Sequence, residues 1–395
     1  MKLFMLNTKP SPWPCFTEEE ANAVREVILS NKVNYWTGQE CRKFEEEFAE
    51  WAGTAHAVAL ANGTLALDAA LKAIGVGSGD EVIVSSRTFL ASASSIVISG
   101  ATPVFADVDR DSQNVNAESI RSVLSTKTKA IICVHLAGWP CEMDPIMALA
   151  REHELYVIED CAQAHGARYK GRSVGSIGHV GAWSFCQDKI MTTGGEGGMV
   201  TTNDRDLWSR IWSYKDHGKS WEAVYERQHL PGFRWLHESF GTNYRMTEMQ
   251  AAIGRIQLER MDQWHETRFV YSRKIWESAK KLDSLRVPDI PDYIEHACYK
   301  CYVFVEPEKL KPDWDRDRIM NAITAEGIPC FSGSCSEVYL EKAFEETGWR
   351  PEERLPCAKE LGETSLMFMV HPTLSEDEID KTCQVIATVV SNASR

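Results

Sequence analysis

Short β-rich runs alternate with helical patterns over the first half of the chain, and this alternation limits the possible folds more than any other feature. The runs lie at 56–60, 81–85, 103–106, 129–135, 155–159, 181–185 and 198–201. The intervening stretches with helical periodicity include 64–73, 117–124 and 144–153. Such alternation is typical of βαβ units, which build a mostly parallel sheet with helices on both faces. We therefore predict an α/β fold with ligands at the carboxyl ends of its strands.

The regular alternation of strand-like and helical patterns ends after residue 201. A helical pattern at 204–212 is followed by a polar, aromatic loop from 215 to 244, and then by a long helical pattern from 246 to 281 with a break. Strand-like runs at 299–305 and 365–370 come later. A chain of 395 residues has room for two such units. We predict a large domain over 1–280, including N-terminal helices, and a smaller α+β domain over 281–395.

Charge and cysteine content narrow the class of protein. A net charge of −14 argues against a protein that coats nucleic acid or anionic lipid. The twelve cysteines are scattered through apolar segments, which favours buried thiols in a reducing compartment. A zinc site at Cys298, Cys301, Cys330 and Cys335 is disfavoured by its loose spacing. No apolar run approaches the roughly 18 residues of a membrane span. We predict a cytoplasmic protein without a metal.

Three polar features follow strand-like runs. Asn62-Gly63-Thr64 opens a helix, where backbone N–H groups bind anions. Asp160 follows the run 155–159, and a carboxylate there needs a cation or several donors. Lys189 lies before a glycine-rich stretch, where partial desolvation would make it a nucleophile toward carbonyls. Taken singly, each has an ordinary alternative as a turn, a helix cap or a surface charge.

Together, the three features are what pyridoxal phosphate requires. A lysine binds its aldehyde covalently, an aspartate keeps its pyridine nitrogen protonated, and a helix start holds its phosphate. A nicotinamide-dependent dehydrogenase is the competing interpretation, suggested by the glycines of 75–80. That run follows a helix and precedes a strand, which is the reverse of a dinucleotide-binding loop.

Six motifs carry a resemblance to a known family. They are NGTLAL at 62–67, RTFLAS at 87–92, VFADVD at 104–109, EDCAQAHGA at 159–167, SFCQDKIMTTGGEGGM at 184–199 and GTNYRMTEMQAA at 241–252. With these motifs, nearly the whole chain resembles the DegT/DnrJ/EryC1/StrS family of sugar aminotransferases. The resemblance implies fold type I, the aspartate aminotransferase-like fold, with a large cofactor domain and a smaller C-terminal domain.

The resemblance also implies roles for individual residues. Lys189 would bind the cofactor and then move a proton between cofactor and substrate. Asp160 would pair with the pyridine nitrogen, Gln163 would bond the ring hydroxyl, and Phe89 would stack on the ring.

The phosphate site is implied in the same way. Gly63, Thr64 and Ser184 would hold the phosphate, and Asn243 would reach it from a second subunit. We therefore expect a homodimer with shared active sites.

The implied reaction moves an amino group from glutamate, by way of pyridoxamine phosphate, to a keto or aldehyde carbon of a sugar. Such amino sugars serve surface polysaccharide or lipopolysaccharide biosynthesis. A pyridoxamine-dependent sugar dehydratase of the same fold has histidine in place of the lysine, so Lys189 argues against it. A non-catalytic sensor would have no need of the complete set of Lys189, Asp160, Gln163 and Thr64.

The acceptor stays open between a nucleotide-linked keto hexose, an oxidised octulosonic acid (giving an 8-amino product) and a keto-inositol. The candidate acceptor contacts are Trp36, His217, Arg245 and Tyr339, and packing is the equal alternative for Trp36, His217 and Tyr339. Two stretches depart from the family pattern. The segment 331–339 is one, and it is a candidate lining of the acceptor pocket. The other is 186–188, where Asp188 either tunes Lys189 or faces solvent, and we favour solvent.

Overall fold

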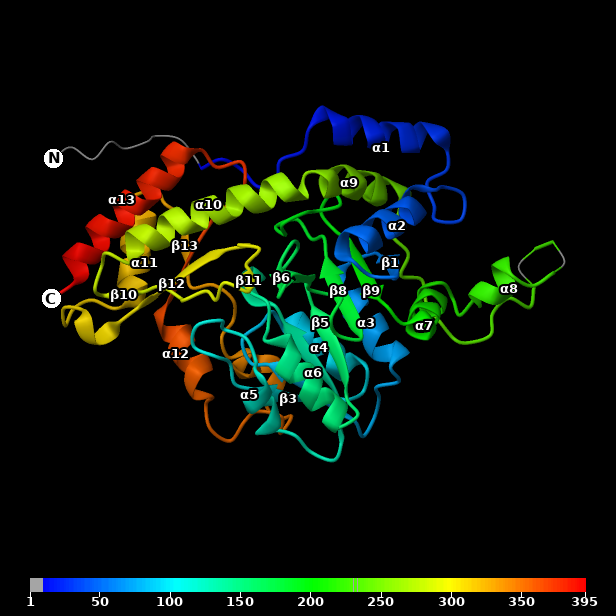
Figure 1. The fold of residues 1–395 in the computed structure, drawn as a ribbon, viewed down its shortest axis with the longest axis horizontal. Helices are drawn as coiled ribbons and strands as arrows, with labels where there is room; N and C mark the ends of the chain where they lie inside the picture. Colours follow the sequence, from blue (N-terminus) through cyan, green and yellow to red (C-terminus); the bar gives the residue numbers. More distant parts are fainter. Residues whose placement is uncertain (1–9, 230, 233) are drawn as a thin grey trace.

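A seven-stranded sheet in the order β1-β9-β8-β5-β4-β2-β3 forms the centre of the computed structural model, which describes residues 10–229, 231–232 and 234–395 (Figure 1). The strands are β1 (His56–Leu60), β2 (Glu81–Ser85), β3 (Thr102–Ala106), β4 (Thr128–Val134), β5 (Tyr156–Asp160), β8 (Val180–Ser184) and β9 (Gly198–Thr202). Neighbouring strands from β3 to β8 pair in parallel, and β9 lies antiparallel between β8 and β1. This confirms the predicted α/β fold with a mostly parallel sheet.

Helices cover both faces of this sheet. The helices along the first half of the chain are α1 (Glu18–Ser30), α2 (Glu40–Ala52), α3 (Gly63–Ala73), α4 (Leu90–Ile98), α5 (Ala117–Arg121), α6 (Met143–Glu152) and α7 (Arg205–Lys215). Successive residues of β4 enter different cores, because side chains alternate across a strand. Ile131 packs with the residues of α5 and α6, whereas Ile132 packs with those of α3.

A second, antiparallel sheet of the order β10-β12-β14-β13 lies in the last third of the chain. Its strands are β10 (Leu285–Arg286), β12 (Cys301–Val305), β13 (Cys330–Phe331) and β14 (Ser365–Phe368), and its helices are α11 (Arg316–Ala325), α12 (Pro356–Thr364) and α13 (Glu376–Ala393). The predicted long helical pattern is two helices, α9 (Glu248–Glu259) and α10 (Met261–Ala279), with the break at Arg260. The end of α10 packs in the core of the second sheet. The predicted division at residue 280 stays a prediction.

The remaining elements are short. They are β6 (Arg168–Tyr169), β7 (Arg172–Ser173), β11 (Ile294–Glu295), α8 (Trp221–Tyr225), η1 (Leu136–Gly138), η2 (Pro307–Lys309), η3 (Val338–Leu340) and η4 (Lys342–Phe344). The segment around α8 extends away from the body of the molecule (Figure 1). Within the described ranges, no helix combines the length and the apolar character needed to cross a membrane.

The turn η1 joins the two sheets by a close backbone approach. The N–H groups of Ala297 and Tyr299 donate to the carbonyls of Gly138 and Ala137, at 2.8 and 2.9 Å. Gly138 has φ +96°, and a Cβ there would lie 2.9 Å from the Cβ of Ala297 and 3.0 Å from the nitrogen of Cys298. Glycine is therefore required at residue 138 by both the backbone conformation and the available space.

We predict that Gly138→Ala lowers the free energy of unfolding by about 3 kcal/mol, because steric overlap adds to the cost of left-handed backbone. Gly171→Ala is the matched control: φ there is +75°, but nothing lies within 4 Å of the added Cβ. Its expected cost is only about 1 kcal/mol. Urea unfolding followed by tryptophan fluorescence compares the two variants, and equal unfolding midpoints would contradict this description of η1.

Candidate active site

The predicted cofactor residues gather at one edge of the large sheet. Strands β2, β4, β5 and β8 are parallel and end at this edge. Strand β9 is antiparallel to both β8 and β1, so β1 runs in the same direction as β8 and ends at this edge too. Asp160 is opposite Ala182 in the pairing of β5 with β8, so Ser184 lies two residues farther along β8. The strand register thus brings together residues that are far apart in the sequence.

Asp160 is the buried anion of this edge, with an exposed fraction of 6%. It is the last residue of β5 rather than the residue after it, which corrects the sequence prediction. Its carboxylate accepts hydrogen bonds from the Ser92 hydroxyl at 2.7 Å and the Ala162 N–H at 3.1 Å. Burial raises the pKa of Asp160, while these two donors, Lys189 and His135 oppose the rise. An additional cationic donor would therefore stabilise this carboxylate.

The first turn of α4 connects Phe89 to the Asp160 carboxylate. It is the residue before that helix, and Ser92, three residues later, donates to Asp160. The Ser92 hydroxyl also lies 2.8 Å from that of Thr88. The ring of Phe89 is 69% exposed, as expected for an aromatic side chain that stacks on a ligand.

Gln163 is oriented by the η1 turn. Its Oε1 accepts a hydrogen bond from the N–H of Ala137 at 2.9 Å, and the side chain is nearly buried. An amide whose oxygen is occupied presents its NH₂ group, which is a donor. A donor is the group needed to bind an oxygen atom on a ligand ring.

His135, Glu159 and Cys161 form a buried cluster behind Asp160, and it is the only metal-sized group of such side chains in the described part of the chain. Glu159 accepts hydrogen bonds from three backbone N–H groups. His135 Nδ1 accepts the Cys141 N–H, so its Nε2 donates to Glu159, at 3.0 Å. These atoms already have partners within the protein, and the cluster supports the end of β5 instead of offering free ligands.

Lys189 lies on the turn after β8, with 17% of its side chain exposed. Its Nζ is 3.7 Å from Asp188 Oδ1 and 5.3 Å from the centre of the Tyr299 ring. The Trp13 indole N–H donates to the Lys189 carbonyl at 2.9 Å, which fixes the backbone of the turn. Asp188 therefore both contacts Lys189 and is exposed, so it is more than the solvated charge that we favoured.

The start of α3 meets the end of β8. Asn62 caps α3 by accepting the Leu65 N–H at 3.0 Å. A Cβ on Gly63 would lie 2.5 Å from Ser184 Cβ, so only glycine lets the helix start approach Ser184 this closely. Thr64 follows, half-buried, in the first turn. N–H groups and two hydroxyls therefore converge at the positive end of a helix, which fits a phosphate.

The described residues match the needs of pyridoxal phosphate. Lys189 offers an amine, Asp160 a buried carboxylate with room for a cationic partner, Gln163 a donor, and the α3 start an anion site. The charge of Lys189 also works to lower the pKa of Asp160, against the effect of burial.

Three of the four acceptor candidates occur together around α7 and its following loop. Arg245 Nη1 donates to Asp216 at 2.9 Å, and Lys219 Nζ lies 3.0 Å from the same oxygen and 4.2 Å from the centre of the Trp36 ring. His217 follows Asp216 and is exposed. Asn243 pairs with Asp216 through the backbone, and its side chain is exposed too.

Tyr339 does not join this cluster. It is 1% exposed, packs on Phe105, and its hydroxyl is bonded to Glu337 and to the N–H of Leu355. Tyr339 is a core residue, and we do not retain it as an acceptor contact.

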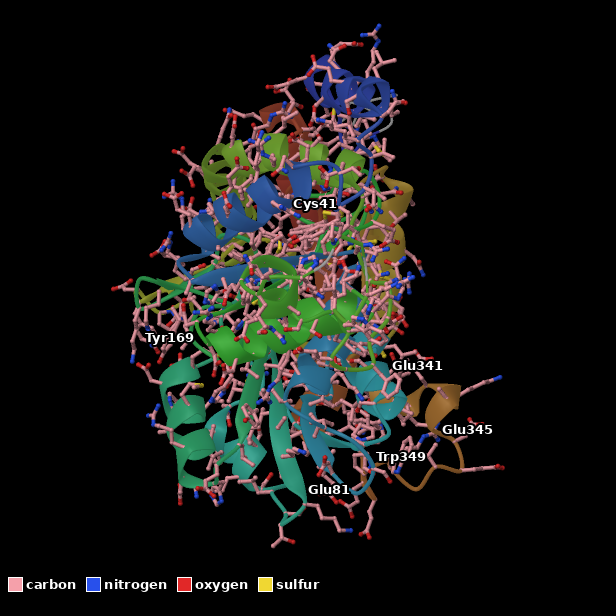
Figure 2. The ribbon with its side chains drawn as sticks, turned by 90° about the vertical axis from the view of Figure 1, so that its right-hand side faces the viewer. Cys41, Glu81, Tyr169, Glu341, Glu345 and Trp349 are labelled. Carbon is pink, nitrogen blue, oxygen red and sulfur yellow. The ribbon has the colours of Figure 1, made fainter. Side chains whose placement is uncertain are left out.

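The segment 331–339 itself does lie beside the candidate site. The Cys335 carbonyl accepts the N–H of Thr88 at 3.1 Å, next to Phe89. Farther along the chain, Glu341, Glu345 and Trp349 lie at one edge of the molecule (Figure 2).

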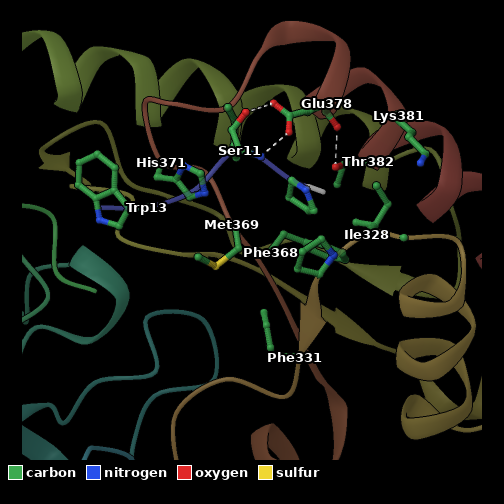
Figure 3. A pocket seen from close by; sticks show the side chains of 14 residues that line it. Ser11, Trp13, Ile328, Phe331, Phe368, Met369, His371, Glu378, Lys381 and Thr382 are labelled. Atoms are coloured by element: carbon green, nitrogen blue, oxygen red, sulfur yellow. Dashed lines mark hydrogen bonds between the residues drawn. The ribbon is translucent and has the colours of Figure 1, made fainter. Parts of the chain in front are cut away.

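A separate cavity of about 250 Å³ lies between the N-terminal segment and the second sheet (Figure 3). Trp13 stacks on His371 at its wall, and Ser11 is hydrogen-bonded to Glu378. None of the predicted cofactor residues lines it.

Sequence reasoning missed several residues of the site. Ser92 had a usable signal, because it falls one helical turn after Phe89 at a helix start. Trp13 and Tyr299 gave no signal, because their contacts with Lys189 and Asp188 join residues 176 and 111 positions apart.

Comparison with known proteins gives consistent matches. The sequence profile described as the DegT/DnrJ/EryC1/StrS aminotransferase family matches residues 14–387. The Spore coat polysaccharide biosynthesis protein SpsC of Bacillus subtilis is 34% identical over 97% of both chains. GDP-perosamine synthase of Escherichia coli O157:H7 is 34% identical over 94% of this chain and 96% of its own. The solved structure of an aminotransferase from Psychrobacter cryohalolentis is 64% identical, with a TM-score of 0.96 over 97% of this chain and 99% of that one.

The raised pKa of Asp160 predicts that this carboxylate lowers the stability of the cofactor-free protein while it strengthens cofactor binding. A folded-state pKa above the unfolded value means that stability falls as pH rises between the two, so at pH 7 the ionised Asp160 costs stability. We expect cofactor-free Asp160→Asn to unfold at the same temperature as the wild type or a higher one, and to lose most of the stabilisation that added pyridoxal phosphate gives. Thermal unfolding with and without cofactor tests this. A cofactor-free variant that is much less stable would contradict the assignment.

Proposed function

The chain belongs to the DegT/DnrJ/EryC1/StrS aminotransferase family and is a pyridoxal-phosphate-dependent sugar aminotransferase, and we propose that it moves the amino group of glutamate to a keto carbon of a nucleotide-linked sugar. The observation that carries the site assignment is the convergence at one sheet edge of buried Asp160, Ser184 and the start of α3, with partly buried Lys189 on the turn after β8. Bound pyridoxal phosphate supplies an electron-accepting ring and an aldehyde that takes up the amino group.

The chain's own residues would divide the remaining work. Asp160 would hold a proton on the ring nitrogen, and the start of α3 with Ser184 would anchor the phosphate. Lys189 would bind the cofactor through its amine and would be the base that moves a proton at the reacting carbon. Only 17% of its side chain is exposed, so the lysine is largely shielded from water.

The nucleotide-linked acceptor is supported by the name of one relative, GDP-perosamine synthase, which matches nearly the whole chain. Products of this kind would serve surface polysaccharide synthesis, in keeping with the name of the Bacillus subtilis relative, or lipopolysaccharide synthesis, and we place the enzyme in the cytoplasm.

We predict that glutamate removes the visible absorbance of the pyridoxal-phosphate-loaded protein, and that a nucleotide-linked keto hexose restores it. The same hexose without its nucleotide should react about 100-fold more slowly, since binding energy from the remote nucleotide is lost. Lys189→Ala should give neither change, whereas the surface variant Lys281→Ala should behave as wild type. Faster restoration by an oxidised octulosonic acid or a keto-inositol would identify a different acceptor.

We further propose a homodimer in which Asn243 completes the phosphate site of the second copy. Its support is that Asn243 is exposed and pairs through its backbone with Asp216, which Arg245 also contacts.

Mixing two inactive variants tests this arrangement. Lys189→Ala removes the amine, and Asn243→Asp places a negative charge against the phosphate. If Asn243 acts across the dimer, mixed dimers contain one intact site, and an equal mixture should recover about a quarter of wild-type activity. If Asn243 serves its own chain, the mixture recovers none, and the shared site is wrong.

A further inference from the structure

Asp188 faces Lys189 through one oxygen and is held through the other. Its Oδ1 lies 3.7 Å from the Lys189 Nζ, and its Oδ2 accepts a hydrogen bond from the Tyr299 hydroxyl. The two carboxylate oxygens thus have different partners, so the carboxylate cannot rotate freely. Asp188 belongs to 186–188, one of the two stretches that depart from the family pattern.

Tyr299 is a rigid support for this carboxylate. It is 6% exposed, and its N–H donates to the Ala137 carbonyl at 2.9 Å. The N–H of the same Ala137 donates to Gln163. A continuous series of contacts therefore runs from Gln163 through Ala137, Tyr299 and Asp188 to Lys189. Burial and Asp188 raise the pKa of Tyr299, so its hydroxyl stays a donor.

The charges around this pair are few. Lys189 contacts Asp188 and acts electrostatically on Asp160, His165 and Lys300, and the buried Arg268 donates to the Tyr299 carbonyl at 3.4 Å. Burial lowers the pKa of Lys300 to about 8, and its Nζ lies 4.6 Å from the centre of the Tyr299 ring. Burial works to raise the pKa of Asp188, but Lys189, Tyr299 and Lys300 together lower it. Asp188 is therefore an anion at neutral pH.

We propose that Asp188, held by Tyr299, is a positioning residue that receives the ammonium group of Lys189 whenever this lysine is not bonded to the cofactor. The nitrogen of Lys189 cannot be a free ammonium paired with Asp188 and be bonded to the cofactor at the same time. A free ammonium offers Asp188 a localised charge and three N–H donors, so the pair stabilises the states in which the lysine is released more than those in which its nitrogen is bonded to the cofactor.

The effect of this pair on the two cofactor forms rests on the proposed function. Lysine is bonded to cofactor in the pyridoxal phosphate form and free in the pyridoxamine phosphate form, so Asp188 favours the second over the first. It lowers the cost of releasing Lys189 in the first half of the reaction and keeps the amine near the reacting carbon. The contact is an ion pair with 58% of the Asp188 side chain exposed, so its effect is moderate.

The dissociation constants of the two cofactor forms test the proposal without any donor or acceptor. Pyridoxal phosphate binding consumes the ion pair, and pyridoxamine phosphate binding leaves it intact. In Asp188→Asn the ratio of the pyridoxamine to the pyridoxal phosphate dissociation constant should rise about fivefold, as for the loss of one partly exposed ion pair. Tyr299→Phe should raise it about twofold, and Asp188→Glu should restore most of the wild-type ratio.

Two variants serve as matched controls. Asp206→Asn removes an exposed carboxylate, and Tyr271→Phe removes a hydroxyl bonded to the Leu374 carbonyl; neither should change the ratio. High salt should raise the wild-type ratio toward that of Asp188→Asn, because exposed ion pairs are screened. A purely structural defect would weaken both cofactors equally.

The outcomes separate this proposal from the proposed function. A ratio unchanged in Asp188→Asn, in a protein that binds both cofactors, would overturn the role of Asp188 and leave the transaminase assignment standing. A wild type that binds neither cofactor would overturn both. A changed ratio in a protein that transfers no amino group to any sugar would support Asp188 and contradict the proposed acceptor.

Discussion

The burial of the Asp160 carboxylate at the end of β5 is the constraint on which the rest of the site depends. An ionised carboxylate in this position costs stability unless donors or a cation surround it. The chain supplies the Ser92 hydroxyl and the Ala162 N–H, and it places the His135–Glu159 cluster behind the strand. These contacts hold the carboxylate in place while leaving it in need of a cationic partner. A protonated pyridine nitrogen would be such a partner. The unpaired carboxylate therefore lowers the stability of the cofactor-free protein and favours binding of the cofactor.

The parallel sheet makes this arrangement possible, because it brings the ends of β1, β2, β5 and β8 to one edge. The second sheet then contributes from the other side through η1. The close approach at Gly138 lets Tyr299 reach Asp188, while Ala137 orients Gln163. Lys189 is therefore held between the large sheet and the antiparallel sheet. Its backbone is fixed by Trp13, and its amine is faced by Asp188.

Sequence patterns predicted the parts that depend on local periodicity and on strand ends. The alternation of strands and helices, a break within the helical pattern of 246–281 and the convergence of Asp160 with the helix start at Gly63 follow from such patterns, whereas the role of Ser184 was implied by the family resemblance. The contacts that tune the site do not, because they join distant segments through packing, as Tyr299 does with Asp188. Tyr339 shows the converse error. Its place in the segment 331–339, which departs from the family pattern, made it a candidate ligand contact, but its hydroxyl is occupied within the core.

The covalent attachment of the cofactor is the most direct test of the whole account. The protein would be loaded with pyridoxal phosphate, reduced with borohydride to make the link permanent, digested and analysed by mass spectrometry. Our account predicts that one peptide carries the added mass of the reduced cofactor, and that fragmentation locates it at Lys189. Attachment at another lysine such as Lys300, or no attachment at all, would contradict the site described for this chain.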